Sequence, residues 1–109
     1  MKALVAVGLL AAGVAQADSS INYIDGNNLY GKLTGESIDL IFAYGYISGV
    51  SDTGQGVTHC ADRNVTIGQI TDMVKQHLTN YPQDRHYQAD NIVIHVLKGT
   101  WPCSKGKSL

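Results

Sequence analysis

Histidines and cysteines are the side chains of this sequence best suited to bind a metal ion. The four histidines stand apart along the chain, at His59, His77, His86 and His95. A zinc site needs three or four converging ligands at set spacings. His59 adjoins a cysteine, but Cys103 is distant in sequence, so a Cys/His site is geometrically awkward. We therefore predict neither a metal site nor a cofactor.

The same residues also give little support for catalysis. His77 and His95 fall on different predicted helices beside apolar rows, so we interpret them as hydrogen-bonded histidines at the core edge. Asp84 with His86 is the best acid–base pair, but no third group that would orient it is identifiable. No Gly-x-Ser-x-Gly nucleophile elbow occurs. We predict that the chain is not an enzyme; an enzyme that uses His86 and Asp84 is an alternative.

The stretch GYISGVSDTGQGVTHC, residues 45–60, changes from apolar to polar midway. Residues 51–62 contain Gly54 and Gly56 among Ser, Thr, Asp and Gln, a composition typical of loops. A phosphate-binding loop would end in Gly-Lys-Ser/Thr and follow a strand, and neither feature is present. Because long loops in small domains are usually functional or mobile, this segment is a candidate binding loop.

The charge pattern excludes one large class of partners. The formal net charge is −1, and most charged residues stand singly. Nucleic-acid binding rests on clustered cations, so we predict no nucleic-acid partner. The chain also lacks a polybasic segment that would hold it on a membrane.

Residues 1–17 have the features of a secretory signal peptide. Lys2 gives a positive start, residues 3–14 are apolar, and Ala15-Gln16-Ala17 is a small-x-small cleavage site. The apolar run is shorter than the roughly 20 residues that span a bilayer, so we expect cleavage rather than stable membrane insertion. The mature chain, residues 18–109, is then a single domain.

Two cysteines, Cys60 and Cys103, remain in that domain. In an exported, oxidising setting an even number of cysteines favours a disulfide. The loop that it closes is long, so the entropic gain is about 4 kcal/mol. Two free buried thiols are the alternative.

The spacing of apolar residues predicts an all-α fold, a small bundle of about four helices stapled by the disulfide. We expect a short helix near residues 27–30 and a longer one from Glu36, capped by Thr34 or Gly35. A third begins at the N-cap Thr66 and ends before Pro82. The fourth covers residues 84–99. The predicted core faces are Ile38, Ile41, Phe42, Gly45 and Gly49; Ile67, Ile70, Val74 and Leu78; and Ala89, Ile92, Val93, Val96 and Leu97.

Two features of the second helix bear on binding. Gly45 and Gly49 each cost about 1 kcal/mol in a helix interior relative to alanine, and close approach of a neighbouring backbone would offset that cost. Tyr44 and Tyr46 flank Gly45, and tyrosine combines a large apolar body with a polar tip. Both tyrosines are candidates for an interface, with partly buried packing residues as the alternative.

Several short motifs together resemble the Rap/Tai family, periplasmic immunity proteins that act against amidase effectors of type VI secretion systems. The resemblance runs from about residue 29 to residue 103. The motifs are Gly45-Tyr46-Ile47-x-Gly49-x-x-Asp52, Cys60, Val65-Thr66-x-Gly68-Gln69, Pro82-x-x-x-His86-x-x-Ala89 and Trp101-Pro102-Cys103.

This resemblance implies a small helical periplasmic protein, commonly a homodimer, that binds a peptidoglycan amidase and blocks its active-site cleft. A protruding loop of such proteins can enter the substrate groove of the enzyme, and residues 51–59 are the matching segment here. The partner-binding residues that we predict are Ser51, Asp52, Thr53, Gly54, Gln55 and Gly56, with Tyr44 and Tyr46.

The chain departs from the family at one point. Many members have a second cysteine pair, at positions that align with Leu33 and Ala43 here. The change is consistent with a disulfide that apolar packing has replaced, and it indicates a divergent member. Two other kinds of protein remain as alternatives: an inhibitor of another cell-wall hydrolase, such as a lysozyme and possibly phage-encoded, and an acid-stress chaperone.

Overall fold

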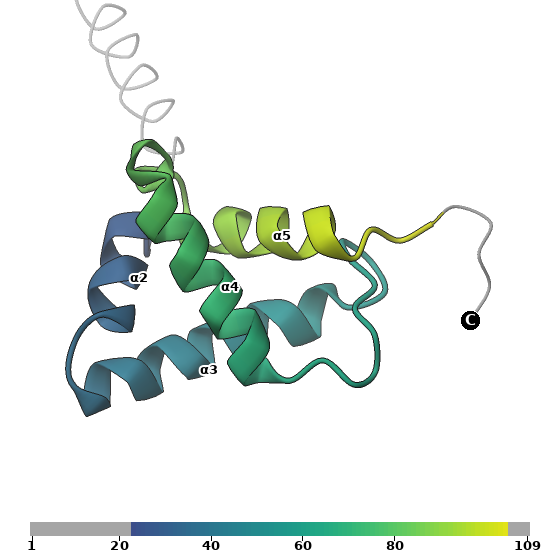
Figure 1. Cartoon of the computed structure of the whole chain (residues 1–109), viewed down its shortest axis with the longest axis horizontal. Coiled ribbons are helices and arrows are strands. Elements are labelled where there is room, and N and C mark those ends of the chain that lie inside the picture. The colour runs from purple at the N-terminus through teal and green to yellow at the C-terminus, as the bar shows by residue number, and fades with distance from the viewer. Residues whose placement is uncertain (1–22, 105–109) are drawn as a thin grey trace, which may run out of the picture.

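The computed structural model describes residues 23–104, which form an all-α bundle (Figure 1). Its four α-helices are α2 (Gly26–Leu33), α3 (Ser37–Gly54), α4 (Ile67–Asn80) and α5 (Ala89–Thr100), with a short 3₁₀-helix η1 (Pro82–Asp84). Within the described residues, extended pairing is limited to two isolated bridges, and no helix has the length and apolar character needed to cross a membrane. The predicted fold class is confirmed. The predicted signal peptide, residues 1–17, lies outside the described part of the chain.

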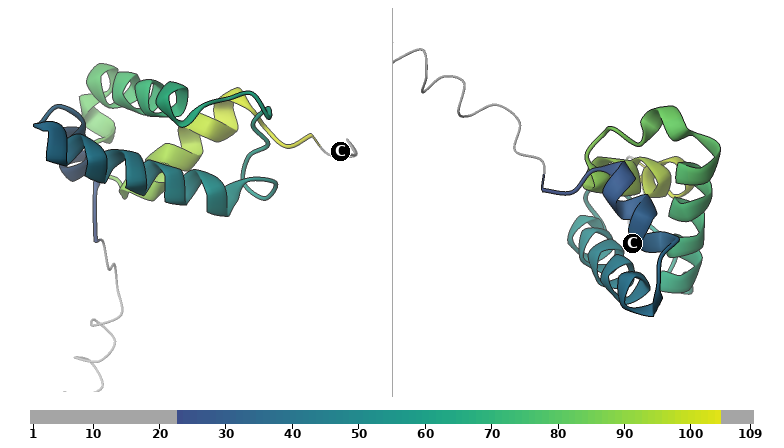
Figure 2. Two further views of the ribbon diagram at one scale, coloured as in Figure 1. Left: turned by 90° about the horizontal axis from the view of Figure 1, so that it is seen from below. Right: turned by 90° about the vertical axis from the view of Figure 1, so that its left-hand side faces the viewer.

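The helices enclose one apolar core. α3 packs against α2, α4 and α5, and Figure 2 shows α5 crossing behind α3 in its left view. Leu33 and Ala43, the positions aligned with a second cysteine pair, are both buried in this core, so packing occupies the place of that bridge. The buried apolar residues are Leu29, Leu33, Ala43, Ile47, Ile70, Val74, Leu78, Ala89, Ile92, Val93 and Leu97.

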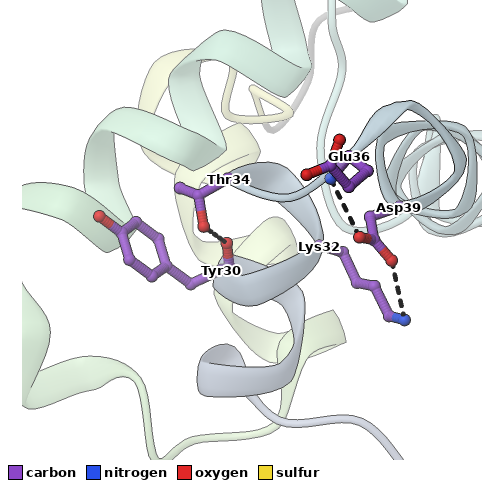
Figure 3. Close-up of polar contacts among 5 residues, drawn as sticks. All are labelled: Tyr30, Lys32, Thr34, Glu36 and Asp39. Carbon is purple, nitrogen blue, oxygen red and sulfur yellow. Dashed lines mark hydrogen bonds and ion pairs between the residues drawn. The ribbon is translucent and has the colours of Figure 1, made fainter.

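The corner between α2 and α3 is fixed by short-range polar contacts (Figure 3). Glu36, rather than Thr34 or Gly35, is the N-cap of α3, and its backbone N–H donates to Asp39. This hydrogen bond, followed by the bond from Lys32, lowers the pKa of the Asp39 carboxyl. The Thr34 hydroxyl instead donates to the carbonyl of Tyr30, 2.9 Å away, at the end of α2. The predicted cap was misplaced because Thr34 closes the preceding helix.

α4 begins and ends where the sequence predicts. Thr66 is the N-cap, its hydroxyl accepts from the backbone N–H of Gln69, and Gln69 reaches back to the N–H of Thr66 at 2.8 Å. This reciprocal arrangement satisfies two amide groups that the first helical turn leaves without partners. The helix stops at Asn80, directly before Tyr81 and Pro82.

The prediction placed the last helix at residues 84–99, but α5 begins at Ala89, five residues later. Its C-cap is Trp101, so Gly99 lies inside the helix. Residues 85–88, which precede α5, are not helical and lie beside the start of the described chain. The backbone N–H groups of Gly26 and Asn27 donate to the carbonyls of Tyr87 and Arg85, and that of Ala89 donates to Ile24. We name residues 24–27 the N-terminal strap.

α3 differs most from its prediction. It continues through Gly54, so residues 51–54 are its last turn rather than part of a loop. Its buried face consists of Ala43, Ile47, Ser51 and Gly54. The face predicted to be buried lies at the surface instead: Ile38 is 71% exposed and Ile41 is 67% exposed. The apolar residues of this helix occur on all sides, so their spacing does not select a face.

Candidate functional site

A tight turn follows α3 at the end of the helix that is far from the α2–α3 corner (Figure 1). The N–H groups of Val57 and Thr58 both donate to the carbonyl of Gly54, and the N–H of Gly56 donates to the carbonyl of His59 at 2.7 Å. Gly56 has φ of 83°, a left-handed conformation that glycine adopts at little cost. Residues 55–59 thus form a compact turn with a defined shape.

Side-chain contacts within residues 54–61 also hold the shape of this turn. The Gln55 side chain donates to the carbonyl of Ala61 and accepts from its N–H. His59 is 1% exposed, with its ring against Gly54 and its Nδ1 2.9 Å from the Thr58 hydroxyl. The turn is therefore anchored by side chains as well as by its backbone.

The predicted Cys60–Cys103 disulfide is present, so the covalent anchor is confirmed. The backbone N–H of Cys60 also donates to the carbonyl of Trp101, 2.8 Å away. Together these bonds tie the far side of the turn to the chain that leaves α5. A turn held on both sides loses little conformational freedom when a partner binds it.

The predicted partner-binding residues are not equally placed for contact. Asp52, Thr53 and Gly56 are exposed, whereas Ser51 and Gly54 are buried in the last turn of α3. The Gln55 side chain is hydrogen-bonded to the backbone of Ala61, and the Thr53 hydroxyl donates to the carbonyl of Gly49. The assignment of residues 51–56 to partner binding stays a prediction, and the structure gives several of them an internal role.

The tip of the turn carries an apolar residue that sequence analysis missed. Val57 is 77% exposed and lies between Gly56 and Thr58. Its branched side chain is attached to a rigid turn, so it can enter a partner's pocket with little ordering cost. A valine within a glycine- and threonine-rich run was the available signal.

A groove of about 620 Å³ lies between α3 and α5 and reaches the turn. Tyr46 lines it, and burial, followed by the charge of Asp90, raises the pKa of its phenol. Tyr44 is also exposed, at 42%, but does not line this groove. The residues that line the groove are Gly45, Tyr46, Gly49, Val50, Thr53, Gly54, Val57, Thr58, Asp90 and Ile94. Sequence analysis named Tyr46, Thr53 and Gly54 as binding residues, but not Asp90 or Ile94.

The histidines do not assemble into a centre that resembles a metal site. His77 pairs with Asp84 at 3.0 Å, whereas His86 packs on Tyr87. The interpretation of His77 as a hydrogen-bonded residue at the core edge is confirmed, while His95 is exposed and contacts the His77 ring. Within residues 23–104, no group of three or more His, Cys, Asp or Glu side chains is placed to hold a metal ion.

Comparison with known proteins supports the resemblance that the motifs indicate. Residues 25–103 match the family described as Rap1a immunity proteins. This match covers α2 to α5, both cysteines and the turn between them. A search of the curated proteins found no match. Since the matched segment is most of the sequence, the chain belongs to the Rap1a immunity protein family.

Proposed function

We propose that this protein is an exported immunity protein that binds a peptidoglycan amidase effector of a type VI secretion system and blocks its active-site cleft. Membership of the Rap1a family supports an immunity function against a secreted effector. The disulfide supports an oxidising compartment, here the periplasm, reached by cleavage after residue 17. The protein acts by occupying space and needs no catalytic group of its own.

The observation that carries this proposal is the anchored turn. Val57 projects from a turn whose two sides are fixed by Gln55, His59 and the Cys60–Cys103 bridge. A rigid projection with an apolar tip suits insertion into a preformed cleft, because the entropic cost of binding is small. Asp52 and Thr53, exposed on the neighbouring helical turn, would lie at the rim of that contact.

An inhibition assay tests the proposal. Purified mature protein is added to a panel of type VI amidase effectors that digest peptidoglycan sacculi. We expect stoichiometric inhibition of at least one amidase, and we expect Val57→Asp to weaken it by about 100-fold, as for a buried hot-spot residue. Gln83→Glu is the control, because it adds the same charge to η1, at the other end of the bundle (Figure 1).

The same assay separates this function from the alternatives. Inhibition of a lysozyme but of no amidase would replace the amidase by another cell-wall hydrolase as the target. Suppression of aggregation of an acid-treated client protein, without inhibition of any hydrolase, would favour the chaperone. If Val57→Asp and Gln83→Glu inhibited an amidase equally, the turn would not be the inhibitory element.

We also propose that the protein forms a homodimer through the N-terminal half of α3. Ile38, Ile41 and Phe42 are exposed there, and exposed apolar patches of this kind mark protein interfaces. Sedimentation equilibrium should show a dimer that Ile41→Glu converts to a monomer. A monomeric wild-type protein at micromolar concentration would contradict this proposal.

A further inference from the structure

Two glycines in the middle of α3 are not explained by packing among the described residues. Gly45 and Gly49 lie one helical turn apart and are exposed, and a Cβ built at either would meet no atom of residues 23–104 within 4 Å. The expectation that a neighbouring backbone of the bundle approaches them is therefore wrong. Each still costs about 1 kcal/mol in a helix relative to alanine. Packing among residues 23–104 does not account for that cost, whereas a contact with another molecule would.

The glycines form part of the wall of the α3–α5 groove described above. Tyr46 and Val50 line it from α3, Val57 from the turn and Ile94 from α5, so most of its surface is apolar. Its volume of about 620 Å³ lies within the range of roughly 300–1,000 Å³ typical of ligand pockets. Missing side chains at positions 45 and 49 let another molecule come close to the α3 backbone.

One end of the groove carries a negative charge. Asp90 is the single Asp or Glu among the lining residues, and no Lys, Arg or His lines the groove with it. It lies close enough to Tyr46 for its charge to act on the phenol. A carboxylate beside apolar walls attracts a cation more strongly than one in open water, because the local dielectric constant is lower. The groove thus has an apolar part over the glycines and an anionic end.

We propose that the α3–α5 groove receives a segment of the effector that has an apolar side chain next to a lysine or arginine. The apolar side chain packs over Gly45 and Gly49, and the cation pairs with Asp90. This inference rests on the proposed function, and it adds a second contact to the one made by the turn. Because Val57 belongs to both the tip and the groove wall, a partner seated on the turn also reaches the groove.

The complementary charge distinguishes this occupant from other candidates. A purely apolar segment would remove water from the Asp90 carboxylate, which accepts a hydrogen bond from the backbone N–H of Asn91 at 2.7 Å but has no cation beside it in the groove, and this desolvation would cost binding free energy. An acidic segment would be repelled. A second copy could also enter the groove with its exposed α3 face, which includes Ile38, Ile41 and Phe42. Lys32 lies over the Phe42 ring of that face but is already paired with Asp39 of its own chain, and the experiment must exclude this occupant.

The test measures affinity for the amidase that the protein inhibits, by titration calorimetry at low and high salt. Gly49→Leu fills the groove, and we expect about 30-fold weaker binding. Asp90→Asn keeps the shape but removes the charge, and we expect about 10-fold weaker binding at low salt, with a smaller difference at high salt. Gly31→Leu is the matched control in α2, since Gly31 is also exposed with nothing within 4 Å of a built Cβ.

Each outcome has a distinct meaning. Weaker binding by Gly49→Leu and Asp90→Asn, with Gly31→Leu at wild-type affinity and all three fully folded by circular dichroism, supports the groove. An amidase that binds all variants equally overturns the groove but leaves the proposed function intact. If no amidase binds the wild type, the proposed function fails first. If Gly49→Leu abolishes only self-association, the occupant is a second copy and the inference is wrong.

Discussion

Two glycines of α3, five residues apart, have opposite surroundings. At Gly54, the last residue of α3, a built Cβ would collide with the Thr58 hydroxyl and lie 2.9 Å from the His59 ring. At Gly49 the same atom would meet nothing within 4 Å. The first glycine is therefore required by packing within the molecule, whereas the second faces open space in the described part of the structure. The closed turn and the open groove lie side by side, and we propose a different role for each.

The closed turn, residues 55–59, depends most on its covalent anchor, the Cys60–Cys103 disulfide. Replacing Cys60 and Cys103 together by serine should lower the free energy of unfolding by about 4 kcal/mol, since the bridge joins residues 43 apart in sequence and restricts the unfolded chain. Urea denaturation monitored by circular dichroism measures this loss. A decrease below about 1 kcal/mol would mean that the turn is held mainly by its hydrogen bonds.

Gly54→Ala tests the tight contact itself. The added methyl group would push the Thr58 hydroxyl and the His59 ring away from the end of α3. Overpacking of this kind costs about 1–3 kcal/mol of stability. The same denaturation experiment measures it. An unchanged free energy of unfolding would show that the turn can shift without strain. The distinction between the closed turn and the open groove would then lose its basis.

Gly49→Ala should have the opposite sign. With open space around the new methyl group, the helix gains up to about 1 kcal/mol from the better propensity of alanine. Gly31→Ala, in α2, should gain a similar amount and serves as the reference. A loss of stability at position 49 alone would reveal a contact that the open groove does not show.

The smallest effect concerns the phenol at the groove. Burial and the charge of Asp90 raise the pKa of Tyr46, so the folded state holds its proton more tightly than the unfolded state. The resulting stability is complete below the unfolded pKa of about 10 and is lost as the pH rises through the higher folded value. Asp90→Asn should lower the pKa without restoring it fully, because burial remains.

Ultraviolet absorbance of tyrosinate during an alkaline titration follows this change, with Tyr46→Phe used to identify the signal among six tyrosines. Asp72→Asn, an exposed carboxyl on α4, is the control and should leave the Tyr46 titration unchanged. Equal titration of the Asp90→Asn and wild-type proteins would mean that the charge does not reach the phenol.

The sequence predicts those elements whose boundaries are set by nearby residues. Thr66, Gln69 and Pro82 determine α4 locally, and its ends were correct. α5 was placed too early because residues 85 and 87 accept hydrogen bonds from the N-terminal strap, a long-range pairing that spacing does not reveal. The orientation of α3 was wrong because Ser51 and Gly54, small rather than apolar, form part of the buried face.

The candidate site shows the same division. Tyr46 and the glycine-rich segment became candidates from residue type, since tyrosines and loops are typical of binding surfaces, although residues 51–54 are helical in the structure. Asp90 was not, because an acidic residue in the first turn of a helix is expected for capping alone. Val57 needed the turn geometry before its exposure could be seen. Convergence of α3, α5 and the turn on one groove is a tertiary property.

The N-terminal strap couples the beginning of the described chain to the start of α5. Ala89 has its backbone N–H bonded to Ile24, and Gly26 is bonded to Tyr87, so the first turn of α5 depends on residues far away in sequence. Asp90, at the anionic end of the groove, lies in that turn. A protease that removed residues up to Gly26 would therefore loosen Asp90 while leaving the disulfide and the turn untouched. Loss of these few residues would thus affect the proposed groove contact more than the proposed turn contact.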